Sequence, residues 1–213
     1  MITLFHNRSG SYISLGGVYE VKNKSTTIKE ITAKVIRQSD NATLSLIWST
    51  FPSPICRRVA GNFETSFETA HPFKVEADTL APAFVEFVDK CANMDEVSNN
   101  ILYPVVCATM PIFSQPNATL PIVDGAVRAL PEYALAKIAL NDHFFWKADE
   151  YEMVITTIHS KGTFDKKYVF SLSDAESFRL RNNIDSVLIS HVANHFGIPV
   201  QVNTVTKDFK EKN

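Results

Sequence analysis

Residues 28–51 carry the clearest alternation of apolar and polar positions in the chain, in two runs on either side of a polar turn at 38–41. The alternating apolar positions are Ile31, Ala33 and Val35 before the turn and Ala42, Leu44, Leu46 and Trp48 after it. Strict alternation is typical of a β-strand that has one buried face. We therefore predict a β-hairpin with Leu44, Leu46 and Trp48 on its inward face.

Shorter runs of the same kind predict further strands on both sides of this hairpin. These runs lie at residues 12–21, 73–77, 83–88, 151–160 and 167–172. Pro52 and Pro54 follow the second hairpin strand and are expected to end it, because proline cannot donate a hydrogen bond to a central strand. The pattern as a whole predicts a mainly β protein with roughly seven strands.

The segment 89–148 interrupts the series of strands. It contains five of the ten prolines, and its helical-looking part at 126–140 is broken by Pro131. Residues 97–123 have no charged side chain, but the prolines and amides among them argue against a membrane-spanning helix. We expect this uncharged stretch to be largely buried or to lie at an interface.

A single amphipathic helix is predicted after the last strand. Ser173 and Glu176 have the spacing of a capping box, and Gly197 and Pro199 are stop signals. The apolar positions at helical spacing are Leu180, Ile184, Val187, Leu188 and Val192. Such a stripe favours packing against a sheet.

The segments DEYEMVITTI and KKYVFSL, taken with the earlier hairpin strands, resemble the plan of an immunoglobulin-like β-sandwich. In such folds a tyrosine near the start of a late strand bonds back across a corner, and Tyr151 occupies a comparable place. The chain departs from the plan because no cysteine stands two residues beyond Tyr151. The inserted segment and the terminal helix are further departures.

The resemblance covers residues 12–88 and 149–172 and implies an antiparallel sandwich. The domain organisation we expect is a β-sandwich with a terminal helix at 1–88 and 149–213, and an inserted proline-rich excursion or small subdomain at 89–148. Folds of this type serve binding, adhesion, chaperoning and linking, so the resemblance implies no particular function.

The composition of 45% apolar and 21% charged residues is that of an ordinary soluble globular protein. A net charge of -2 with dispersed basic residues argues against nucleic-acid binding, which needs a concentrated basic face. The three cysteines have neither zinc-knuckle nor CxxC spacing, which argues against a disulfide scaffold.

The opening residues lack the apolar core of a signal peptide, which leaves two possible cellular compartments. We expect either a cytoplasmic protein or the soluble part of a membrane-associated or extracytoplasmic bacterial protein. Membrane association would then depend on sequence outside these 213 residues.

His191 and His195 stand four residues apart on the predicted helix, as the two metal-binding histidines of a zinc-protease helix do. The segment reads HVANH, with Val192 where the HExxH motif has its catalytic glutamate. A metal site would need a third ligand from elsewhere in the chain. The simpler interpretation is a pair of core histidines, or cations favoured near the helix C-terminus.

The aromatic segment Phe144, Phe145 and Trp146 is the remaining candidate. Exposed, it would form a binding surface; buried, it would fix the inserted segment to the β-domain, which is the commoner role of large aromatic residues.

The chain has no GxSxG, GxGxxG or GxxxxGK motif. Our leading hypothesis is a non-catalytic β-sandwich module that binds an unidentified protein without a cofactor. The alternative is a metal-dependent enzyme centred on His191 and His195. A third hypothesis is a carbohydrate-binding sandwich that uses exposed Trp48 or Trp146.

Overall fold

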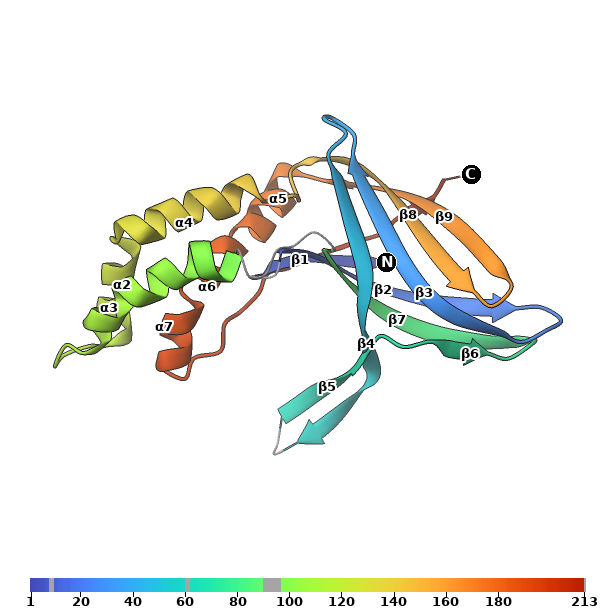
Figure 1. Ribbon diagram of the computed structural model, residues 1–213, viewed down its shortest axis with the longest axis horizontal. Helices are drawn as coiled ribbons and strands as arrows, with labels where there is room; N and C mark the ends of the chain where they lie inside the picture. The colour runs from blue at the N-terminus through green and yellow to red at the C-terminus, as the bar shows by residue number, and fades with distance from the viewer. Residues whose placement is uncertain (8–9, 60–61, 90–96, 213) are drawn as a thin grey trace.

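The computed structural model describes residues 1–7, 10–59, 62–89 and 97–212, and for residues 52–59 and 62–67 it describes the backbone only. A curled antiparallel sheet forms one part of the molecule, and helices gather beside one end of it (Figure 1). The expected mainly β fold class is therefore confirmed.

The sheet contains all the described strands in one connected ladder. They are β1 (Ile2–Asn7), β2 (Gly10–Val21), β3 (Thr26–Arg37), β4 (Thr43–Val59), β5 (Asn62–Thr69), β6 (Phe73–Val75), β7 (Thr79–Asp89), β8 (Asp149–His159), β9 (Gly162–Leu172), β10 (Thr204–Lys207) and β11 (Lys210–Glu211). Their order is β10-β1-β2-β7-β4-β3-β8-β9-β11, with β5 beside β4 and β6 beside β3. They outnumber the roughly seven predicted strands, since alternation is hard to recognise in runs as short as β1 and β11.

The predicted hairpin is β3 and β4. Ala33 pairs with Leu46 and Val35 with Leu44, and Trp48 is buried on the same face of β4. The Trp48 ring makes edge contacts with aromatic rings from β4 and β6. The inward orientation predicted from alternation is therefore confirmed.

The prediction that Pro52 and Pro54 end the second strand is wrong. β4 continues through them to Val59, and its pairing with β5 shifts register between Pro52 and Cys56. Beyond Thr50, β4 has exchanged its neighbour β7 for β5. Figure 1 shows the β4–β5 hairpin projecting from the sheet, where a proline interrupts no central ladder.

The immunoglobulin-like sandwich is not confirmed. A sandwich consists of two stacked sheets, whereas here one connected sheet curls into a half-barrel (Figure 1). Tyr151 nevertheless bonds back along the chain, as the resemblance implies: its hydroxyl donates to the carbonyl oxygen of Lys147 at 2.5 Å. This local contact therefore occurs without the two-sheet architecture.

The inserted segment is mainly helical where it is described, and further helices follow β9. The helices are η1 (Val97–Leu102, a π-helix), α2 (Tyr103–Phe113), α3 (Leu120–Arg128), α4 (Pro131–Asp142), α5 (Asp174–Arg181), α6 (Asn183–Leu188) and α7 (Ser190–His195). Pro131 separates α3 from α4, as the sequence indicated. Within the described residues, no helix is long and apolar enough to cross a membrane.

The single amphipathic helix predicted after β9 is wrong in its continuity, because it is divided into α5, α6 and α7. The capping box is present, and Gly197 has the positive φ of 67° that favours glycine after a helix. Asn183 lies just beyond the first break and is fully buried. Its side chain exchanges hydrogen bonds of 2.7 and 2.8 Å with the backbone of Asn203, which joins the helix start to the returning chain.

The inserted helices and the terminal helices form one packed unit. Helix α4 contacts α6, α3 contacts α7, and α2 contacts α3 and α4. We call residues 97–142 and 174–195 the helical unit; Figure 1 shows it beside the end of the sheet where β1 lies. The expected division into a β-domain and a separate insertion stays a prediction, although the insertion packs on the C-terminal helices.

Trp146 joins the helical unit to the sheet. Its side chain is fully buried, and its indole N–H donates to the carbonyl oxygen of Phe5 in β1 at 3.2 Å. Its own carbonyl oxygen accepts a hydrogen bond of 2.8 Å from the hydroxyl of Ser177 in α5. Sheet and helices therefore meet around one aromatic side chain whose polar atoms are satisfied.

Replacing Trp48 tests the inward face of the hairpin. Trp48→Ala should lower the free energy of unfolding by about 3 to 5 kcal/mol, since it removes a large buried ring. Ile47→Ala, on the opposite face and 37% exposed, is the matched control and should cost less than about 1 kcal/mol. Urea unfolding followed by circular dichroism measures both, and equal losses would contradict the described orientation.

His6, on β1, is a buried titratable residue at the junction where Trp146 joins the helical unit to the sheet. Its ring is 4% exposed and meets the ring of Phe144 edge-on, with centroids 5.3 Å apart. Nδ1 of His6 is the one buried side-chain polar atom without a hydrogen-bond partner among the described residues. Burial lowers the pKa of His6 to about 4, because a charged imidazolium would be poorly solvated there.

This lowered pKa predicts a loss of stability in mild acid. Between pH 6.5 and about pH 4 the unfolded chain binds a proton at His6 that the folded protein excludes, so stability falls as the pH falls. The full effect is about 3 kcal/mol. Unfolding free energies of wild type and His6→Phe, measured across this range, should diverge by that order; parallel curves would disprove the assignment.

Candidate functional site

His191 is held by the helical unit itself. It lies on α7, and its Nε2 is 2.9 Å from the hydroxyl oxygen of Thr109 on α2. Burial lowers the pKa of His191, and a hydrogen bond with the backbone of Leu188 partly opposes this shift. The ring therefore helps to attach α7 to α2.

His195 has a similar structural contact. Its ring stacks on Phe113 of α2, with centroids 4.0 Å apart and planes inclined by 17°. No group of three or more His, Cys, Asp or Glu residues that could hold a metal occurs in the part of the chain that the structure describes. The metal-dependent enzyme stays a prediction. The described residues provide no third ligand beside His191 and His195.

The aromatic segment at 144–146 lies in the core. Phe144 and Trp146 are buried, and only Phe145 is partly exposed, with the guanidinium of Arg37 5.3 Å from its ring centroid. These side chains therefore offer little accessible surface to a binding partner. The carbohydrate hypothesis needs an exposed tryptophan, whereas Trp48 is 9% exposed and Trp146 0%.

An apolar surface is exposed on α2 instead. Tyr103 is 61% exposed and Met110 57%, and Cys107 between them is also exposed as a free thiol. Their spacing of four and three residues places them on one helix face, which we call the α2 stripe. The uncharged stretch 97–123 was expected to be largely buried or to lie at an interface. Because these side chains are exposed, the interface is the expectation that the structure favours.

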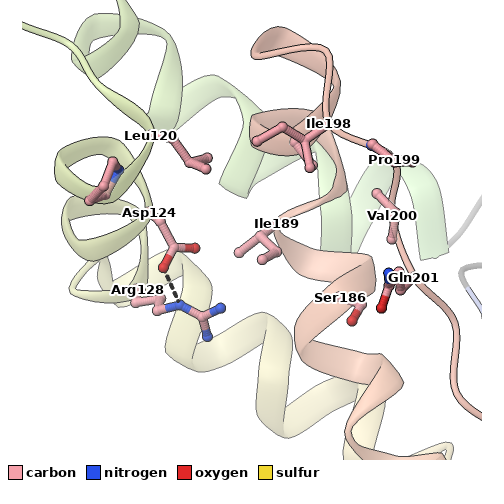
Figure 2. Close-up of a pocket in the computed structure, with 11 residues that line it drawn as sticks. Leu120, Asp124, Arg128, Ser186, Ile189, Ile198, Pro199, Val200 and Gln201 are labelled. Carbon is pink, nitrogen blue, oxygen red and sulfur yellow. Dashed lines mark hydrogen bonds and ion pairs between the residues drawn. The ribbon is translucent and has the colours of Figure 1, made fainter.

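A pocket of about 400 Å³ lies elsewhere on the helical unit (Figure 2). It is formed by α3, α6, α7 and the chain that follows α7. Its lining residues are Leu120, Pro121, Asp124, Arg128, Ser186, Ile189, Ala193, Ile198, Pro199, Val200 and Gln201. A mostly apolar lining with a few polar groups, at this volume, is typical of small-molecule sites.

An ion-pair network fixes the polar wall of this pocket. Nε of Arg128 donates to Oδ2 of Asp124 at 2.9 Å, one turn earlier on α3. Nη1 of Arg128 donates to the hydroxyl of Tyr133 at 3.1 Å, and that hydroxyl donates to Oδ1 of Asp185 at 2.6 Å. Nζ of Lys137 lies 2.8 Å from the same oxygen.

The network also sets the ionisation of its members. Burial works against the charged form of Asp185, but hydrogen bonds from Lys137 and Tyr133 outweigh it, so the pKa of Asp185 is lowered. The pKa of Tyr133 is raised, first by burial and then by its hydrogen bond to Asp185. The tyrosine is therefore neutral at ordinary pH and serves as a hydrogen-bond donor.

Sequence reasoning missed this pocket because its walls are far apart along the chain. Residues 120–128 form one wall and residues 186–201 the other. The available signal was the Asp124 and Arg128 pair at i and i+4 on a helix, which is common on exposed helices and by itself indicates no site.

Tyr133→Phe tests the network. Loss of the hydroxyl removes one hydrogen bond from Arg128 and one from Asp185, which keep Asp124 and Lys137 as partners, so the free energy of unfolding should fall by about 1 kcal/mol. Tyr103→Phe, on the exposed face of α2, is the control and should change it by less than about 0.5 kcal/mol. Chemical denaturation provides the comparison; a neutral Tyr133→Phe would show that the hydroxyl contributes nothing.

No family model, curated protein or solved structure matches the chain. The α2 stripe and the pocket beside Arg128 are therefore the features from which a function is inferred.

Proposed function

We propose that the protein is a non-catalytic interaction module that binds another protein through the α2 stripe of Tyr103, Cys107 and Met110. The observation that carries the proposal is the exposure of an apolar helix face inside an uncharged stretch, residues 97–123. Water-exposed helix faces are usually polar. Covering an apolar face with a partner removes it from water and so lowers the free energy.

The composition of the stripe supports this role. Tyrosine and methionine are enriched in the centres of protein interfaces, and charged residues are depleted there. The flexible side chain of Met110 can adapt to an irregular partner surface. A partner with an apolar, uncharged patch matches this chemistry best, because a charged patch would lose solvation without finding an ionic partner.

The helix that presents the stripe is rigidly supported. Its inner face is buried through Val105 and Thr109, and Thr109 also contacts His191 on α7. A supported helix loses little conformational entropy on binding, which favours affinity. The curled sheet would then act as a scaffold for the helical unit.

The proposal is tested by photo-crosslinking in cells of the source organism. A benzophenone amino acid in place of Tyr103 should form a discrete adduct with one protein, and Met110→Glu should abolish it by burying a charge in the interface.

Phe178→Glu is the matched control, since Phe178 is 66% exposed on α5, outside the α2 stripe, and its replacement should leave the adduct intact. The unfolding curves of both variants show whether either change perturbs the fold. A missing adduct, or one whose yield Met110→Glu leaves unchanged, would refute binding through α2.

A further inference from the structure

We propose that the pocket between α3, α6, α7 and residues 198–201 binds a small neutral molecule that has a carboxamide group and a compact apolar body. This inference goes beyond the proposed function, because the pocket residues are different from those of the α2 stripe. Either proposal can fail without the other.

The polar wall presents a hydrogen-bond donor and an acceptor side by side. Nε and Nη1 of Arg128 are engaged by Asp124 and Tyr133, whereas Nη2 has no partner among the described residues. Asp124 uses Oδ2 for Arg128, and its Oδ1 is similarly unengaged within those residues. Figure 2 shows the two side chains next to each other on the α3 side of the pocket.

A carboxamide fits this pair of groups. Its carbonyl oxygen can accept from Nη2 of Arg128 while its N–H donates to Oδ1 of Asp124, so both partners receive charge-assisted hydrogen bonds. The guanidinium is already held in place by two contacts, which reduces the entropy lost when a ligand binds.

The charges around the pocket select against ionised ligands. Asp124 and Asp185 balance Arg128 and Lys137, so the network as a whole is neutral. A ligand carboxylate bound to Arg128 would be repelled by the adjacent Asp124. A ligand ammonium bound to Asp124 would meet Arg128 in the same way. Only a group that is both donor and acceptor, without net charge, meets neither repulsion.

The rest of the pocket accommodates an apolar body. Ile189, Ile198 and Val200 face the polar wall across the cavity, as Figure 2 shows. Ser186 and Gln201 lie on the same far side and provide secondary polar contacts. A branched aliphatic chain of a few carbons fills such a space better than a charged or extended one.

The test uses an isosteric series of probes on the whole chain. Isovaleramide, isovalerate and isopentylamine share the branched body and differ in the head group. Ligand-observed and protein-observed NMR titrations should show saturable binding of isovaleramide with a Kd of about 1 mM, as expected for so small a ligand. The two charged analogues should bind at least about tenfold more weakly.

Two variants locate the binding. Arg128→Gln replaces the guanidinium with a shorter side chain that ends before the position of Nη2, and it should weaken isovaleramide binding about tenfold. Arg179→Gln on α5 is the matched control and should leave the Kd unchanged. Ser186→Leu fills the pocket from a partly exposed position and should abolish binding even if Arg128→Gln proves unstable. Equal binding of the three probes, no saturable binding, or binding that survives Ser186→Leu would overturn the proposal.

Discussion

The burial of Trp146 is the constraint on which the rest of the structure depends. The chain leaves the sheet at β7 and returns at β8, and Trp146 lies just before that return with its indole bonded to β1 and its carbonyl bonded to α5. A buried indole N–H or carbonyl without a partner would cost free energy, so the positions of β1 and α5 are tied to it. The sheet and the helical unit are therefore parts of one core.

In this arrangement, buried side chains hold the helices together and other side chains form the accessible surface. The histidines that first suggested a metal site contact Thr109 and Phe113 and stabilise the docking of α7 on α2. The aromatic segment at 144–146, which suggested a binding surface, is mostly buried. The accessible features of the helical unit include the α2 stripe and the pocket beside Arg128, and both are supported by buried neighbours. This division favours binding over catalysis as the proposed activity.

The degree to which sequence alone predicted the fold varied with the range of the interactions. The β3–β4 hairpin was predicted with the correct inward face, because alternation records burial directly and Trp48, Leu44 and Leu46 share one side. The capping box at Ser173 was also local and correct. The two prolines in β4 misled the prediction, since their effect depends on which strand lies beside them. Beside the break in the terminal helix, Asn183 exchanges hydrogen bonds with the backbone of Asn203, a contact that no periodicity reveals.

The sequence by itself determined the mainly β class, the hairpin, the helix start at Ser173, the separation of α3 and α4 at Pro131 and the uncharged stretch at 97–123, because each follows from neighbouring residues. Only the tertiary structure decided that the strands form one curled sheet, since strand order depends on pairings between distant segments such as β1 and β10. The pocket was decided in the same way: Asp124 and Arg128 come from the inserted segment and Ile189 from the terminal one, and packing alone brings them together.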